Sequence, residues 1–380
     1  MTGSGIVTTH PIAQPTPDPV PAGSPTHTPD TPPNADTTAS ADPRHSALVT
    51  AARGGRARHT PVWFMRQAGR SLPEYKKVRE GIPMLESCAM PDLVTEITLQ
   101  PVRRHGVDAA ILFSDIVVPL KAIGVDLDIV AGTGPVVAEP FATRADLDRL
   151  PALTPEHVPY ITEAVGSLVA ELGPTPLIGF TGAPFTLASY LVEGGPSKTH
   201  QRTKALMHGD PELWHDLCAR LAQIAGTFLQ VQIDAGASAV QVFDSWVGAL
   251  PRTDYLRFVE PHSRAVLETV AGQVPRIHFG VGTGELLADM AAAGTEVIGV
   301  DYRLSLTDAV QRTGGAYAVQ GNLDPALLFA PWPVIEARVI EIVEEGRAAP
   351  GHIFNLGHGV LPDTDPSVLT RVVELVHSLG

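Results

Sequence analysis

Two arginines four positions apart are the first residues of this chain that could do chemistry. Arg66 and Arg70 stand in the run PVWFMRQAGRSLPEY, with Gly69 between them and an apolar, strand-like segment before them. At this spacing on a helical or turn-like backbone, their Cβ atoms would lie about 5–6 Å apart. Each guanidinium offers a planar fork of donors that suits a carboxylate. The pair predicts a site for an anion with several carboxylates, and a structural ion pair with Glu74 or Glu80 is the alternative.

Polar residues also follow two other apolar runs. Asp115 ends the run ILFSD, and Ser245 follows the run QVFD. A carboxylate at such a place can accept several N–H bonds from a ligand, and a hydroxyl can add a neutral hydrogen bond. Either residue could instead cap the helix that follows it. Both are therefore candidate site residues with a structural alternative.

Tyr190 and His358 are two further candidates. Tyr190 stands in GFTGAPFTLASYLVEGG at helical spacing from Leu187, so a core tyrosine is its alternative role. His358 stands in FNLGHGV between Gly357 and Gly359, which permit unusual backbone angles and the close approach of a ligand. The alternative for this histidine is a solvated or structural loop residue.

These candidates need secondary structure that brings them together. Short apolar runs without proline alternate with longer stretches of helical periodicity, such as Glu212–Ile233. Eight strand–helix units over roughly 330 residues predict a single (β/α)8 barrel, with its chemistry at the carboxyl ends of the strands. A doubly wound open sheet is the alternative, but no G-x-G-x-x-G motif follows an early strand. The expected strands are Val62–Met65, Ala109–Phe113, Leu177–Phe180, Ala239–Phe243, Arg276–Phe279, Val297–Val300, Ala318–Gln320 and His352–Asn355.

The charge of the chain limits its partners. Of 380 residues, 44% are hydrophobic, and 27 basic against 41 acidic residues give a net charge of −14. An acidic protein is a poor binder of nucleic acid and of an anionic membrane. In physiological salt, charges more than about 8 Å away are largely screened. The acidic surface therefore does not prevent a local arginine cluster from binding a small anion. The expected partner is therefore a small anionic molecule.

Cysteine usage and hydropathy indicate a compartment. Cys88 and Cys218 make no disulfide framework and have no zinc-type spacing. No apolar run reaches the roughly 18 residues of a transmembrane helix, and no signal peptide is expected. These features predict a cytoplasmic protein.

The N-terminal segment differs from the rest of the chain. Residues 1–43 are mostly Pro, Thr, Ala, Asp and Ser. Such a composition cannot bury enough apolar surface to offset the entropy of ordering. We expect a disordered tail over residues 1–43, with a docking tail as the alternative, and the barrel over residues 44–380.

Five segments together resemble the uroporphyrinogen decarboxylase family. They are PVWFMRQAGRSLPEY, FSDIVVP, GFTGAPFTLASYLVEGG, QVFDSW and NLGHGVLPDT, and the resemblance covers about residues 45–380. The first and third segments match the two signature motifs of the family in order and spacing, which makes the resemblance highly specific. One departure is Ser71, where the family often has an aromatic residue.

The resemblance implies a (β/α)8 barrel that acts as a homodimer without a cofactor or a metal. It implies conversion of uroporphyrinogen III to coproporphyrinogen III, with four acetate carboxyls lost as CO2, in haem biosynthesis. The catalytic residues that it implies are Asp115, Arg66 and Arg70. The substrate-binding residues that it implies are Arg66, Gln67, Arg70, Asp115, Tyr190, Ser245 and His358, with Arg79 as a weaker match.

Two other functions are compatible with parts of this pattern. A cobalamin-linked methyltransferase would have a similar fold but would carry a zinc site with His and Cys ligands, and neither cysteine stands at a matching strand end. A non-catalytic tetrapyrrole carrier would keep Arg66 and Arg70 but would not need Asp115 together with Tyr190 and His358. The complete set therefore favours the enzyme.

Overall fold

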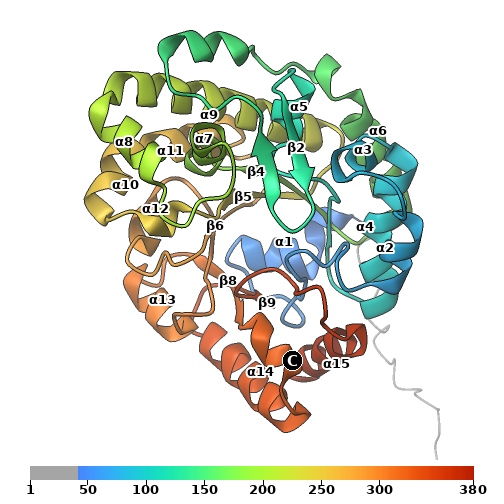
Figure 1. Cartoon of the computed structure of the whole chain (residues 1–380). Coiled ribbons are helices and arrows are strands. Elements are labelled where there is room, and N and C mark those ends of the chain that lie inside the picture. Colours follow the sequence, from blue (N-terminus) through green and yellow to red (C-terminus); the bar gives the residue numbers. More distant parts are fainter. Residues whose placement is uncertain (1–41) are drawn as a thin grey trace, which may run out of the picture. The chain divides into compact units, whose positions relative to one another are not determined.

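Seven parallel strands lie side by side in the order in which they occur in the chain (Figure 1). The computed structural model describes residues 42–380, so the predicted tail over residues 1–43 lies almost wholly outside the described residues. Each strand pairs in parallel with the next one. The strands are β1 (Ala110–Ile111), β4 (Leu177–Gly182), β5 (Ala239–Asp244), β6 (Arg276–Gly280), β7 (Val297–Gly299), β8 (Ala318–Leu323) and β9 (His352–Leu356).

A short segment before β1 closes the ring of strands. Phe354 in β9 donates its N–H to the Pro61 carbonyl at 2.8 Å, and Val62 forms a parallel bridge with Phe354. On the other side, the Asp108 N–H donates to the Val62 carbonyl at 2.8 Å, just ahead of β1. Residues 61–65, called the closing strand below, thus join β9 to β1. This confirms the predicted (β/α)8 barrel, with its first strand reduced to a single bridge.

Buried amides cross the interior of the barrel. The Trp63 indole N–H in the closing strand donates to the Gln320 side-chain oxygen in β8 at 3.0 Å. The Gln320 amide donates in turn to the Gln241 oxygen in β5 at 2.9 Å. All three side chains are buried, so these bonds are made where water does not compete. They compensate for the few backbone bonds that the closing strand makes.

Helices follow most strands and cover the barrel, as the periodicity predicts. The predicted helix Glu212–Ile233 is observed as Pro211–Asp234, where Asp210 caps the first turn by accepting the Leu213 N–H at 3.0 Å. The helices are α1 (Ala47–Ala52), α2 (Pro73–Val78), α3 (Met84–Cys88), α4 (Pro91–His105), α5 (Val118–Ala122), α6 (Pro159–Leu172), α7 (Pro184–Glu193), α8 (Gln201–Gly209), α9 (Pro211–Asp234), α10 (Arg252–Phe258), α11 (Glu260–Thr269), α12 (Leu287–Ala292), α13 (Leu306–Arg312), α14 (Trp332–Gly346) and α15 (Pro366–Ser378).

An antiparallel hairpin, which the sequence patterns did not predict, is inserted after α5. It consists of β2 (Leu127–Val130) and β3 (Gly134–Val137), with Gly132 and Gly134 in left-handed conformations at the turn. Val137 donates its N–H to the Gly194 carbonyl at 3.0 Å, where α7 ends. The hairpin therefore lies beside the helix that carries Tyr190 (Figure 1).

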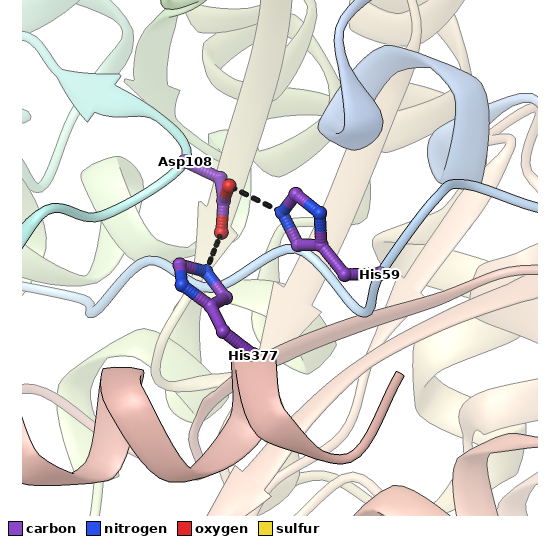
Figure 2. Close-up of side chains that lie close together, drawn as sticks. All are labelled: His59, Asp108 and His377. Carbon is purple, nitrogen blue, oxygen red and sulfur yellow. Dashed lines mark hydrogen bonds and ion pairs between the residues drawn. The ribbon is translucent and has the colours of Figure 1, made fainter.

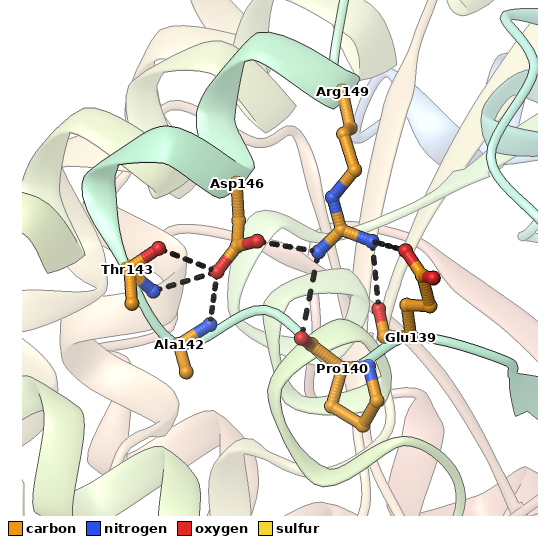
Figure 3. Close-up of polar contacts among 6 residues, drawn as sticks. All are labelled: Glu139, Pro140, Ala142, Thr143, Asp146 and Arg149. Atoms are coloured by element: carbon orange, nitrogen blue, oxygen red, sulfur yellow. Dashed lines mark hydrogen bonds and ion pairs between the residues drawn. The ribbon is translucent and has the colours of Figure 1, made fainter.

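An arginine fixes the chain as it leaves this hairpin (Figure 3). The Arg149 guanidinium donates to the Glu139 carbonyl at 3.0 Å, to the Pro140 carbonyl at 3.4 Å and to the Asp146 carboxylate at 2.9 Å. Asp146 also accepts the Thr143 N–H at 2.7 Å. These bonds fold residues 139–149, which follow the hairpin, into one compact segment.

A carboxylate between two histidines joins distant parts of the chain at the amino ends of the strands (Figure 2). Asp108 contacts the Nε2 atoms of His59 and His377 at 2.7 Å each, and it accepts the Val62 N–H at 2.8 Å. We call His59, Asp108 and His377 the clasp. Burial raises the pKa of Asp108, but the bonds from His377, His59 and Val62 outweigh burial and bring this pKa to about 2. The clasp ties α15 to the closing strand.

Candidate active site

Arg66 and Arg70 lie in a turn that leaves the closing strand, and not on a helix. Both have left-handed backbones, with φ angles of 63° and 38°. A non-glycine residue in such a conformation costs on the order of 1–3 kcal/mol, and such residues cluster at functional sites. The alternative prediction of an ion pair with Glu74 is wrong, because the Glu74 carboxylate binds Arg104 at 2.6 and 2.8 Å. Within residues 42–380, neither arginine of the turn forms an ion pair.

Gln67 holds this turn from within. Its side chain is 2% exposed, accepts the Phe64 N–H at 2.9 Å and donates to the Ala109 carbonyl at 2.9 Å. Both ends of the amide are thus engaged with the backbone of the closing strand and of the segment before β1. The structure gives Gln67 a positioning role, and its contact with the substrate stays a prediction.

The segment after β9 packs directly on Arg66. An alanine at position 359 would place its Cβ 2.5 Å from the Arg66 Cδ, so only glycine leaves room for the arginine side chain. The Val360 N–H donates to the Met65 carbonyl at 2.8 Å, and the Met65 N–H donates to the Asn355 side chain at 2.9 Å. The first and last motifs of the sequence therefore form one wall.

His358 lies on the same wall and is neutral in this arrangement. The Gly359 N–H donates to His358 Nδ1 at 2.7 Å, which leaves the proton of a neutral ring on Nε2. Partial burial lowers the pKa of His358, and the charges of Arg66 and Arg303 lower it further, against the opposing effect of Asp301. His358 keeps an exposed face, so its Nε2–H can donate to a ligand.

Asp115 lies in the loop between β1 and α5, opposite Arg66. The Val117 N–H donates to its carboxylate at 3.1 Å, so Asp115 shapes this turn, while Val117 occupies the cap position of α5. Burial raises the pKa of Asp115, and the Val117 N–H, the Arg66 charge and the Ile116 N–H partly offset that rise. A carboxylate in this setting is an acceptor with few competing water molecules.

Tyr190 lies on α7 and is buried, with 9% of the residue exposed. The ring packs edge to face against Trp246, with centroids 5.9 Å apart. Burial raises the pKa of Tyr190; a hydrogen bond with Trp246 lowers it, the Asp115 charge raises it and the Arg66 charge lowers it. The charges of Asp115 and Arg66 therefore both act on the hydroxyl of this core tyrosine.

The remaining predicted residues are less closely tied to this cluster. Ser245 follows β5 and is half-buried, and Arg70 is half-buried four residues beyond Arg66. Arg79 ends α2, where it lies over the Tyr75 ring at 5.4 Å and contacts the Met84 sulfur at 3.0 Å. The structure thus brings Arg66, Asp115, Tyr190 and His358 together, and a substrate contact of Arg79 stays a prediction.

Two residues near the cluster were missed by sequence reasoning. Trp246 directly follows Ser245, and Arg303 follows Asp301 at the end of β7. Both stand where a buried strand gives way to polar residues, which was the signal used for Asp115 and Ser245.

One group of residues in the described part of the chain could hold a metal ion. The ligand atoms of His59, Asp108 and His377 lie within 4.8 Å of one another. This group is the clasp, at the amino ends of the strands, whereas Arg66 and Asp115 lie at the carboxyl ends. The two cysteines are free and buried. No helix among residues 42–380 is long and apolar enough to cross a membrane.

Comparisons with known proteins match nearly the whole described chain to one family. A family model described as uroporphyrinogen decarboxylase (URO-D) matches residues 43–379. The uroporphyrinogen decarboxylase of Salinispora tropica is 68% identical over 339 residues, which cover 89% of this chain and 91% of that protein. Those of Streptomyces griseus and Thermobifida fusca are 68% and 62% identical, cover 87% and 88% of this chain, and are themselves covered to 91% and 92%.

Solved structures agree on the fold. A methyltransferase from Methanosarcina mazei superposes with a TM-score of 0.75 at 20% identity, over 88% of this chain and 98% of that chain. A B12-independent methionine synthase from Shewanella superposes with a TM-score of 0.52 at 10% identity, over 76% of this chain and 88% of that chain. At these identities the likeness concerns the fold alone.

Proposed function

The chain belongs to the uroporphyrinogen decarboxylase family, and we propose that it decarboxylates uroporphyrinogen at the cluster of Arg66, Asp115, Tyr190 and His358. The reaction converts the four acetate side chains of uroporphyrinogen III to methyl groups, which yields coproporphyrinogen III and four CO2 in haem biosynthesis. The observation that carries the site assignment is the meeting of these four side chains, from four separate segments, at one end of the barrel.

The cationic and neutral donors of the cluster suit a substrate with eight carboxylates. Arg66 and Arg70 extend from a turn whose backbone is held by buried bonds, and each offers a planar fork of donors to a carboxylate. The neutral His358 offers one N–H, and Tyr190 and Ser245 add hydroxyl donors. In this proposal Gln67 acts indirectly, by positioning Arg66.

Asp115 is the best candidate for stabilising the charge that forms during the reaction. A carboxymethyl group on a pyrrole loses CO2 only when the electrons left behind have an acceptor, and protonation of a ring carbon creates a cationic one. An ionised Asp115 can accept the pyrrole N–H groups and face this cation. At about 4 Å and an effective dielectric constant of about 20, the attraction would be about 4 kcal/mol.

Arg66 supports this role by its effect on Asp115. Burial alone favours the protonated carboxyl, which could not stabilise a cation, and the positive charge of Arg66 opposes that protonation. Arginine keeps its own proton in proteins, so it is a poor general acid. We therefore assign Arg66 and Arg70 to carboxylate binding, and we assign the proton delivery to no residue.

The decisive experiment uses anaerobic incubation with uroporphyrinogen, oxidation of the products and chromatography. Porphyrins with seven to four carboxyls should appear in succession, and Asp115→Asn should abolish them without loss of fold. A folded protein that binds the substrate without any loss of CO2 would instead support a tetrapyrrole carrier. Transfer of a methyl group with no decarboxylation would support the methyltransferase alternative.

Two further expectations follow from the family resemblance and from the cysteine usage, respectively. We propose that the chain acts as a homodimer and that it works in the cytoplasm. Light scattering during size-exclusion chromatography would test the first, since a monomer at working concentration would contradict it. Fractionation of cells with an antibody would test the second.

A further inference from the structure

A guanidinium outside the cluster is held at the same end of the barrel by a buried carboxylate. β7 is followed by Asp301, whose side chain is 3% exposed, and by Arg303, whose side chain is 50% exposed. The Arg303 Nη1 donates to Asp301 Oδ2 at 2.7 Å, and the Arg303 N–H donates to Oδ1 at 3.0 Å. Asp301 also accepts the Gly282 N–H. The carboxylate is thus shared among three donors, and it fixes the guanidinium without enclosing it.

The backbone under this arginine is fixed as well. The Asn322 amide in β8 donates to the Asp301 carbonyl at 2.9 Å and to the Leu304 carbonyl at 2.5 Å, on either side of Arg303. The guanidinium lies over the Tyr302 ring, 4.4 Å from its centroid. A side chain held in this way loses little conformational freedom when it binds a ligand.

Arg303 lies beside the wall formed by His358 and Arg66. A Cβ on Gly357 would be 2.2 Å from the Tyr302 backbone nitrogen, so the loops after β7 and β9 are in direct contact. The charge of Arg303 acts on His358, whereas the arginine whose charge acts on Asp115 is Arg66. β7, which precedes Arg303, lies four strands away from β1, which precedes Asp115, in either direction around the ring. Arg303 therefore extends the cationic wall on the side of the barrel away from Asp115.

We propose that Arg303 binds a carboxylate side chain of the tetrapyrrole that is retained through the reaction. This inference rests on the proposed function. A cation that held the departing carboxylate would stabilise its charge in the ground state and so oppose CO2 loss. A cation remote from Asp115 avoids that conflict, which suits a propionate.

The test compares Arg303→Met and Arg303→Lys with Arg347→Met. Arg347 is a matched control, because it is 55% exposed, bonds one carboxylate (Glu344) at 2.7 Å and lies at the end of α14, ahead of β9. R303M should raise KM for uroporphyrinogen about five- to tenfold with kcat within about twofold, as expected for the loss of one ordinary hydrogen bond, since the Arg303 charge is already shared with Asp301. R303K should raise KM by about threefold, because lysine keeps the charge but not the fork. R347M should match the wild type.

Inhibition by coproporphyrinogen tests which carboxylates Arg303 binds. Coproporphyrinogen has lost the acetate carboxyls and retains only the propionates, so its binding reports on the retained carboxylates. R303M should weaken this inhibition by the same factor as it raises KM. An R303M with wild-type KM, or with unchanged inhibition by coproporphyrinogen, would overturn the proposal while leaving the function intact. A wild-type enzyme that releases no CO2 would refute the function itself. If thermal melting shows that R303M does not fold, the KM of R303K tests the proposal instead. A wild-type KM in R303K would then overturn it.

Discussion

Replacing Gly359 with alanine would test whether the position of Arg66 matters for the reaction. The new Cβ would lie 2.5 Å from Arg66 Cδ, and ordinary contacts begin at 3.4 Å, so the arginine side chain must retreat by about 0.9 Å. A misplacement of about 1 Å at a reacting site can cost on the order of 10²-fold in rate. We therefore expect G359A to lower kcat/KM about 10- to 100-fold. Tm should change by only a few degrees, because the atom that must move belongs to a flexible side chain.

The pH profile of G359A provides a second measurement. The charge of Arg66 lowers the pKa of Asp115 against the effect of burial. Moving that charge away should raise the pKa of Asp115, so the ionised form would be lost at a higher pH. The acid limb of kcat/KM should then shift to higher pH in G359A.

Two controls make the result specific. Gly284→Ala places a Cβ no closer than 3.5 Å to its nearest neighbour, Arg312 Nη1, in another loop at the same end of the barrel. It should retain wild-type kinetics. In an Arg66→Met background, G359A should cause no further loss, because the side chain that it displaces no longer carries a charge. A G359A enzyme with wild-type kcat/KM, or a full additional loss in the double variant, would refute the reasoning.

Four other changes have defined outcomes. Asp115→Asn should lower kcat about 10³-fold at unchanged Tm, in line with an attraction of about 4 kcal/mol; near-normal turnover would exclude the central role of this carboxylate. Arg70→Lys should lower kcat/KM about tenfold because a point charge cannot replace a fork, and unchanged kinetics would argue against bidentate binding. Deletion of residues 1–41 should leave kcat/KM unchanged, given their composition, and a loss of activity would show that they take part. Asp108 raises the pKa of His377, so the stabilisation by that histidine is complete below about pH 6.5 and is lost as pH rises through the raised pKa. His377→Ala should therefore lower Tm more at about pH 6 than at about pH 8.5, and an equal loss at both would contradict a charged clasp.

The barrel was predictable because buried parallel strands have a simple sequence signature. Strands such as β4 and β7 are buried along their whole length, and nearly all of their residues are apolar or small. The hairpin of β2 and β3 was missed because its four-residue strands are partly exposed and include Pro135 at the paired edge. Its short, half-polar pattern did not stand out from the helical segments on either side.

The site was predictable in its residues but not in its geometry. Asp115 and His358 could be found because polar residues that follow apolar runs stand at strand ends. The left-handed backbones of Arg66 and Arg70 could not be found, since neither residue favours that conformation and only the surrounding contacts impose it. The inward orientation of Gln67 also depends on a partner, the Ala109 carbonyl, 42 residues further along the chain.

The closing strand has an evolutionary consequence. Val62 is bonded to Asp108 through both its N–H and its carbonyl, and Met65 is likewise bonded through its N–H and its carbonyl. Arg66 therefore directly follows the last bonded residue of the closing strand. Inserting or deleting one residue here would move the residues of the closing strand to its opposite face and remove Arg66 from the wall. Homologues should therefore keep the length of this segment constant. New substrate preferences would arise more readily from changes in the β2–β3 hairpin, whose length no strand of the barrel constrains.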